Sequence, residues 1–199
     1  MSGHVLEKWP DSVVTAGREP VAENLADFEA VLGDASDERP IQKLLASSPV
    51  LLGPLVPAGG TYWCLDRPRL GAEYVPDFLL ATVTSVGFRW LAIELESPVA
   101  RALTKRGLPA RKLAEALGQV RDWRTWLSEN VSYARDERGL KDIDGSCDAV
   151  VVIGRRSTLD PKQITRYRAL STNGLTVMSY DRLGDTIRNS VRGTEVRHG

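Results

Sequence analysis

Two neighbouring segments of the chain, both predicted to be β-strands, carry three acidic residues. Asp77 lies in the segment 75–83, Glu94 lies near the end of the segment 88–95, and Glu96 follows directly. Because side chains alternate between the two faces of a strand, Glu94 and Glu96 face the same side. Carboxylates held close together repel one another and raise each other's pKa unless a cation neutralises them. Hard oxygen ligands with room for water suit Mg2+ or Mn2+, which can activate a bound water and neutralise a transferring phosphoryl group.

The turn between the two segments decides which acid lies opposite Asp77. A four-residue loop over 84–87 places Asp77 opposite Glu94, whereas a two-residue loop at 86–87 places it opposite Glu96. A three-residue loop would turn Asp77 to the wrong face unless a bulge corrected it. Val86 resists the positive φ of the tight two-residue turn, so the longer loop is favoured, with Cβ atoms about 5 Å apart.

A plainer interpretation of these acids stays open. They could be dispersed along an exposed sheet edge, some of them paired with Arg89 or Arg101. For a single Asp or Glu that interpretation is the better one. The trio beside an apolar strand pair favours a functional site, since charged residues are seldom central in a sheet without a partner.

Apolar periodicity and helix caps predict the elements that must position these acids. The predicted helices cover 21–32, 37–47, 110–129, a segment opening at Asp160-Pro161, and 181–191, and the predicted strands cover 61–65, 75–83, 88–95, 148–154 and 175–179. The order ααβββαβαβα indicates an α/β domain with a central sheet flanked by helices. The continuous apolar run 150–153 is typical of a central strand covered on both faces. We expect an N-terminal extension over 1–19, one compact domain over 20–193 and a C-terminal tail over 194–199.

Composition excludes several classes of protein. The 199 residues suit one domain, and 26 basic and 26 acidic side chains give no net charge, so any nucleic-acid surface must be a local patch. Cys64 and Cys147 are far apart and lack a CxxC partner, which favours reduced, buried thiols over a zinc site or a disulfide. No apolar run approaches the ~20 residues of a membrane helix and no signal peptide is evident, so we expect no membrane partner and a cytoplasmic location. The GxSxG, GxxxxGK[ST] and HExxH motifs are all missing.

A basic segment follows the acidic pair directly. Because the second strand ends at Glu96, this segment must begin near the acids, where its side chains could hold DNA phosphates. Its basic residues are Arg101, Lys105, Arg106, Arg111 and Lys112. The alternative is a solvated loop and helix start, in which Glu115 pairs with Arg111 four residues earlier. Second candidates for phosphate contact are Arg155 and Arg156.

At these residues the chain resembles the PD-(D/E)XK nuclease superfamily, in which an acid on one strand precedes an acid-x-lysine on the next. More narrowly, it resembles the Shedu-type domain of bacterial anti-phage defence proteins. The resemblance spans roughly residues 37–185, and the segments that carry it are 38–45, 48–52, 76–78, 94–98, 116–123 and 152–156. It implies a restriction-endonuclease-like mixed sheet flanked by helices and a Mg2+- or Mn2+-dependent DNA endonuclease. Family members tend to self-associate, so a homo-oligomer is also expected.

The resemblance assigns roles to individual residues. Asp77 and Glu94 match the metal ligands, with the backbone carbonyl of Leu95 between them. Glu38 matches an extra acid that some members bring to the site, although it could equally complement a helix dipole. Gln119 matches a glutamine on the helix after the motif, but it also shares a helix face with Ala116, Trp123 and Trp126 that could simply pack. The two tryptophans could stack on bases, although packing against the sheet or a second subunit is favoured.

One position departs from the superfamily pattern. Glu96 stands where the motif has its lysine, and a carboxylate cannot supply positive charge, although it could act as a general base or a further ligand. A minority of restriction endonucleases carry acid-x-acid here and remain active. Lys105 or Lys112 could reach in as a substitute. Three functions therefore stay open: a nuclease, a catalytically silent DNA-binding or assembly module on the same fold, and an interaction domain whose acids bind a basic partner protein.

Overall fold

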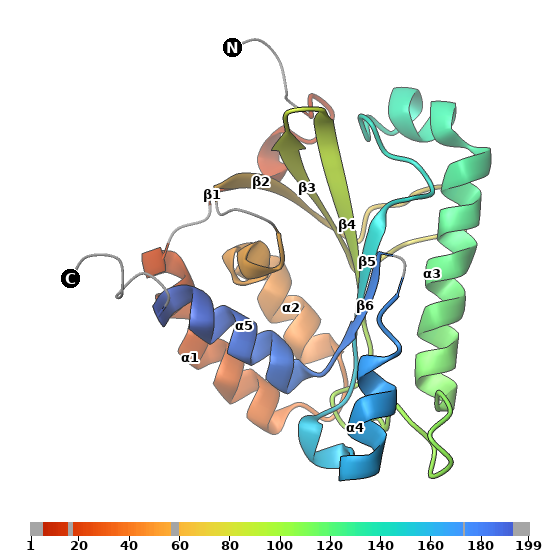
Figure 1. Ribbon diagram of the computed structural model, residues 1–199. Coiled ribbons are helices and arrows are strands. Elements are labelled where there is room, and N and C mark those ends of the chain that lie inside the picture. Colours follow the sequence, from red (N-terminus) through yellow and green to blue (C-terminus); the bar gives the residue numbers. More distant parts are fainter. Residues whose placement is uncertain (1–5, 16–17, 57–59, 173, 193–199) are drawn as a thin grey trace.

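A six-stranded mixed β-sheet forms the centre of the molecule (Figure 1). The computed structural model describes residues 6–15, 18–56, 60–172 and 174–192. The strands lie in the sheet in the order of the sequence: β1 (Val13–Thr15), β2 (Thr61–Asp66), β3 (Phe78–Thr84), β4 (Gly87–Leu95), β5 (Asp148–Val152) and β6 (Leu175–Met178). Neighbours from β1 to β4 are antiparallel, and β4, β5 and β6 are parallel. Strand β4 is therefore the border between the two halves of the sheet.

Helices cover both faces of this sheet. The long helix α3 (Arg111–Glu129) lies on one face, and α1 (Arg18–Asp34), α2 (Arg39–Ser47) and α5 (Tyr180–Arg192) lie on the other, while the short α4 (Pro161–Arg168) lies near one end of the sheet (Figure 1). This arrangement confirms the predicted α/β class and is compatible with a restriction-endonuclease-like fold. No helix among the described residues is both long and apolar enough to cross a membrane.

Strand alternation divides the core into two apolar layers. On β3, Phe78 and Leu80 pack in the layer beneath α1, α2 and α5, whereas Leu79 and Ala81 pack in the layer beneath α3. The predicted central strand behaves in the same way, because every residue from Ala149 to Val152 is buried and successive residues belong to opposite layers. An acid that takes the place of an apolar residue on such a strand is thus forced out of water.

The predicted element order misses β1. Within the expected N-terminal extension, Pro10–Ser12 forms a 3-10 helix and Val13–Thr15 pairs with Thr61–Trp63 of β2, while Leu6 is fully buried in the α3 layer. A three-residue strand is too short to show any period, which is why the sequence did not reveal it. The expected C-terminal tail, 194–199, lies outside the described residues.

Candidate functional site

The β3–β4 hairpin confirms the predicted register. Phe78 pairs with Ile93, and the pairing continues without a bulge to Thr84 and Gly87, which places Asp77, just before β3, opposite Glu94. The turn itself is tighter than expected, since only Ser85 and Val86 lie between the last paired residues. Gly87, with a φ of +116°, takes the unusual backbone conformation that Val86 would resist.

Asp77 and Glu94 are each held by one hydrogen bond. The backbone N–H of Leu95 donates to Oδ2 of Asp77 at 2.8 Å, and the indole N–H of Trp123 on α3 donates to Oε1 of Glu94 at 3.2 Å. Glu94 is only 8% exposed and Asp77 is half-buried. The sheet and α3 therefore fix both carboxylates where water cannot fully solvate them.

Burial, together with the charges of neighbouring acids, weakens both carboxyl groups as acids. Burial raises the pKa of Glu94 to about 8, helped by the charge of Asp77 and opposed by the hydrogen bond from Trp123. Burial also raises the pKa of Asp77 to about 6, against the Leu95 hydrogen bond and the charge of Arg67. Without a cation, the pair consequently keeps a proton at neutral pH, and a divalent cation would displace it.

Glu96 is paired with a lysine from the next helix. Its Oε2 lies 3.3 Å from Nζ of Lys112, in the first turn of α3, and the whole residue is only 8% exposed. Burial raises the pKa of Glu96, and Lys112 opposes that rise. Lys112 thus brings a positive charge beside the position at which the superfamily motif has its own lysine.

Two further residues border the acids from the opposite side of the sheet. Glu38, half-buried just before α2, makes no side-chain cap hydrogen bond, and its charge helps to raise the pKa of Asp77 and of Glu96. Tyr180 opens α5 and is fully buried, and its hydroxyl has no hydrogen-bond partner among the described residues. Burial, with the charges of Asp77, Glu38 and Glu96, raises the pKa of Tyr180. A buried hydroxyl of this kind can be satisfied by an ordered water.

The donor set fits a hydrated cation better than an all-protein cage. No group of three or more acid, histidine or cysteine side chains within the described ranges is gathered closely enough to hold a metal ion. Asp77 and Glu94 provide two carboxylates, and Mg2+ is commonly bound by one or two carboxylates while it keeps several waters. The unpaired Tyr180 hydroxyl would suit such a water.

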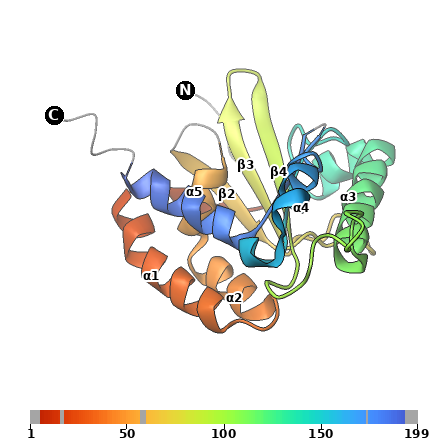
Figure 2. The ribbon, with the colours of Figure 1, turned by 60° about the horizontal axis from the view of Figure 1, so that its bottom comes forward.

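The other predicted residues divide into two groups. Gln119 is exposed on α3, one turn before Trp123, and its side chain makes no hydrogen bond to the described residues. Arg101, Lys105 and Arg106 are exposed on the segment that leads to α3. These four are free to meet a ligand at the end of the sheet where β4 finishes, which Figure 2 brings forward together with α2 and α4.

The remaining basic candidates are occupied within the protein. Arg111 donates to Glu115 at 2.9 Å, the helix pair that the sequence offered as the alternative. Arg155 pairs with Asp181 on α5 at 3.1 Å, and Arg156 pairs with Asp185 at 2.5 Å. Arg155 and Arg156 therefore hold α5 to the segment that follows β5. All three arginines are less available for phosphate because each already has a carboxylate partner.

Sequence reasoning missed part of this site. Trp123 is 2% exposed, so it packs as expected and cannot stack on bases, but its hydrogen bond to Glu94 was not foreseen. Tyr180 and Arg67 were not singled out at all, because neither belongs to a motif or to an acidic segment. Trp126 is half-buried against Tyr74 and Tyr133.

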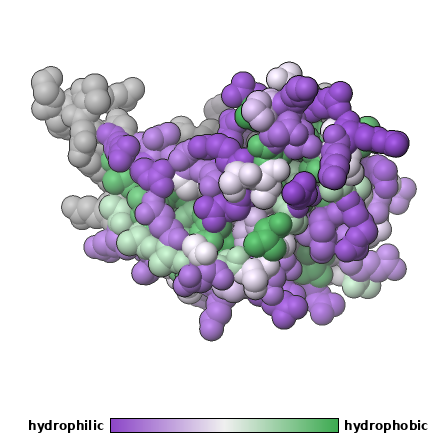
Figure 3. Space-filling view, turned by 90° about the horizontal axis from the view of Figure 1, so that it is seen from below, coloured by the Kyte–Doolittle hydropathy of each residue, from purple (hydrophilic) through white to green (hydrophobic). Residues whose placement is uncertain are grey.

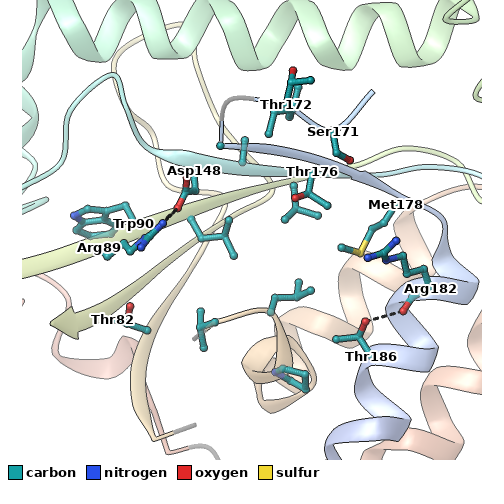
Figure 4. Close-up of a pocket in the computed structure, with 18 residues that line it drawn as sticks. Thr82, Arg89, Trp90, Asp148, Ser171, Thr172, Thr176, Met178, Arg182 and Thr186 are labelled. Atoms are coloured by element: carbon teal, nitrogen blue, oxygen red, sulfur yellow. Dashed lines mark hydrogen bonds and ion pairs between the residues drawn. The ribbon is translucent and has the colours of Figure 1, made fainter. Parts of the chain in front are cut away.

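A separate pocket of about 530 Å3 lies away from the acids, toward the beginnings of β5 and β6 (Figure 4). Figure 4 shows the Arg89–Asp148 ion pair at one side and Arg182 and Met178 at the other. None of its lining residues is one of the predicted site residues. Arg89 therefore pairs with Asp148 and not with the acidic trio.

The fold and site together define an α/β protein with a mixed sheet flanked by helices, compatible with a restriction-endonuclease-like fold, and with acidic residues where β3 and β4 meet. The family model for the C-terminal part of the Shedu protein SduA matches residues 35–183 of this chain. The chain belongs to this Shedu family, which suggests a role in anti-phage defence. No curated protein matches the chain significantly.

Proposed function

We propose that the chain is a metal-dependent endonuclease that hydrolyses phosphodiester bonds of DNA in anti-phage defence. The observation that carries the proposal is the pair formed by half-buried Asp77 and buried Glu94 at the junction of β3 and β4, in a chain of the Shedu family. These carboxylates and the backbone carbonyl of Leu95 would hold Mg2+ or Mn2+. The bound ion would supply an activated water and neutralise charge on the scissile phosphate.

The chain's own residues prepare the site for this chemistry. The Leu95 N–H and the Trp123 indole fix one oxygen of each carboxylate, so the second oxygen of each can turn to a cation. Glu94 and Asp77 must lose their protons before they bind it, and their raised pKa values make binding depend on pH near neutrality.

Glu96 and Lys112 take the two remaining roles. Glu96, with its raised pKa, accepts a proton from the attacking water as a general base. Lys112 supplies positive charge to the phosphate in place of the motif lysine. Gln119 and Glu38 border the same end and orient water or phosphate, and Arg101, Lys105 and Arg106 hold the DNA backbone.

A plasmid-nicking assay with Mg2+, Mn2+ or EDTA tests the proposal. Asp77→Asn and Glu94→Gln keep the size of the side chains and remove the charges, so cleavage should disappear. Asp122→Asn is the matched control, because Asp122 is an exposed acid of α3 whose carboxylate contacts Arg121. Metal-independent cleavage, or cleavage that survives both site variants, would refute the assignment.

A catalytically silent DNA-binding module is the second candidate, favoured by the acid at position 96. In that case the Lys112 ion pair merely neutralises Glu96 within the fold. DNA binding without nicking under any metal would establish this function. Glu96→Lys then becomes informative, since cleavage gained by the variant would identify a decayed nuclease site.

A further inference from the structure

A further pocket, of about 430 Å3, opens between α4 and the basic segment that leads to α3. Four of its seven lining residues are basic: Lys105, Arg106, Lys162 and Arg166. The first two were singled out in the sequence, whereas the two on α4 were not. We call this the α4 pocket.

Specific contacts hold the two walls of the α4 pocket together. Gln163 of α4 donates to the backbone oxygen of Thr104 at 2.9 Å, and Arg166 donates to that of Arg106. Gly107 has a φ of +77°, a backbone conformation that glycine adopts readily, and it lies against the side chain of Arg166. The pocket is therefore a built feature of the fold.

The positive charge of the α4 pocket is not neutralised within the described residues. None of its four basic side chains forms an ion pair there with an acid. The one acid in its wall, Asp160, is occupied as the helix cap, accepting the N–H of Gln163 at 2.9 Å. In a chain with no net charge, the wall of the α4 pocket thus contains four basic side chains and one acid. Such a concentration of like charge favours binding of an anion.

We infer that the α4 pocket binds a backbone phosphate of duplex DNA, away from the bond that is cut. This inference deepens the proposed function and rests on DNA as the substrate. The pocket shares the basic segment that starts just after Glu96, and it lies at the end of the sheet where β4 finishes. Figure 3 shows this end from below, where hydrophilic side chains cover much of the surface. Phosphate contacts of this kind fix the position of a duplex without reading its sequence.

Anisotropy of a short fluorescent DNA duplex, titrated with the full chain in EDTA at several salt concentrations, tests the pocket. Each lost phosphate contact reduces the slope of log affinity against log salt concentration by about 1, so Lys162→Ala/Arg166→Ala, which removes the one phosphate contact of the pocket, should reduce it by about 1. Lys141→Ala/Arg192→Ala removes the same charge away from the pocket and should leave the slope unchanged. Lys162→Gln alone, on an exposed position, weakens the same contact, should reduce the slope by up to about 1, and covers the case in which the double variant unfolds.

The outcomes separate the pocket from the nuclease proposal. An unchanged salt slope in the α4 variants, or an equal change in the control, overturns the inference that the α4 pocket binds phosphate, even if the chain cleaves DNA. A reduced slope in the α4 variants of a chain that cuts no DNA supports phosphate binding by the α4 pocket and refutes the proposed nuclease activity. Displacement of DNA by inorganic phosphate beyond the effect of ionic strength identifies a free-anion site and overturns the DNA assignment. If the wild-type chain binds no duplex at low salt, the inference also fails.

Discussion

Ionisation of Glu94 in the cation-free protein should weaken the fold as the pH rises. Burial raises the pKa of Glu94 from 4.5 to about 8, and one pKa unit corresponds to about 1.4 kcal/mol. Full ionisation inside the folded chain therefore costs about 5 kcal/mol. Because the folded state holds the proton more tightly than the unfolded state, the stabilisation is complete below pH 4.5 and is lost as the pH rises through about 8.

Urea unfolding in EDTA, followed by tryptophan fluorescence between pH 5 and 8.5, measures this effect. The contribution of Glu94 to the free energy of unfolding of the wild type should fall by about 4 kcal/mol across this range. Asp77, with its pKa of about 6, contributes only to the lower part of the fall. The scan stops at pH 8.5 because burial also raises the pKa of Cys64 and of Cys147, so thiols that ionise in the unfolded state would add their own effect.

Glu94→Gln isolates the cause. The amide oxygen still accepts the Trp123 hydrogen bond but cannot ionise, so the fall above pH 6 should disappear. Saturating Mg2+ should flatten the wild-type profile, since a ligand at a hundred times its Kd stabilises the folded state by about 2.7 kcal/mol. Glu129→Gln, an exposed acid at the end of α3, is the control and should follow the wild type. A flat wild-type profile, or a full fall retained in Glu94→Gln, would refute the reasoning.

Three further predictions concern single contacts. Lys112→Ala should lower the nicking rate by ~100-fold while Lys112→Arg retains most of it, because the positive charge beside Glu96 is what matters; equal losses in both variants would contradict this. Trp123→Phe removes the donor to Glu94 and raises its pKa further, so the pH at which cleavage is half-maximal should move upward in a pH–rate profile; an unmoved midpoint would exclude the link. Gly154→Ala should lower the free energy of unfolding, measured by urea unfolding, by at least ~1 kcal/mol, because Gly154 has a φ of +66° and a Cβ would collide with the Ala100 carbonyl. Gly118→Ala, in the open middle of α3, should instead raise it by up to ~1 kcal/mol.

The local part of the site could be predicted from sequence. Alternation on two apolar strands predicted the pairing of Asp77 with Glu94, because it is a property of adjacent segments, although the four-residue loop expected from Val86 is in fact a two-residue turn. The predicted helices also begin and end within a few residues of the observed ones, since caps and apolar periods are local signals.

What the sequence could not predict depends on how distant elements pack. The sequence offered Lys105 or Lys112 as a substitute for the motif lysine, and only the way in which α3 lies across the sheet places Lys112 beside Glu96. The same holds for Arg155 and Arg156, which looked available for phosphate until α5 supplied their carboxylate partners. Strand β1 was missed because three residues give no period.

Helix α3 controls whether the carboxylates that it covers are exposed to solvent. One helix provides both Trp123, which contacts Glu94, and Lys112, which contacts Glu96, so undocking of α3 would expose both acids to solvent together. Exposed carboxylates ionise more easily than buried ones, so alkaline conditions favour the undocked arrangement. Amide hydrogen exchange in α3, corrected for the intrinsic effect of pH, should therefore accelerate above the pKa of Glu94 and slow again when a divalent cation occupies the acids.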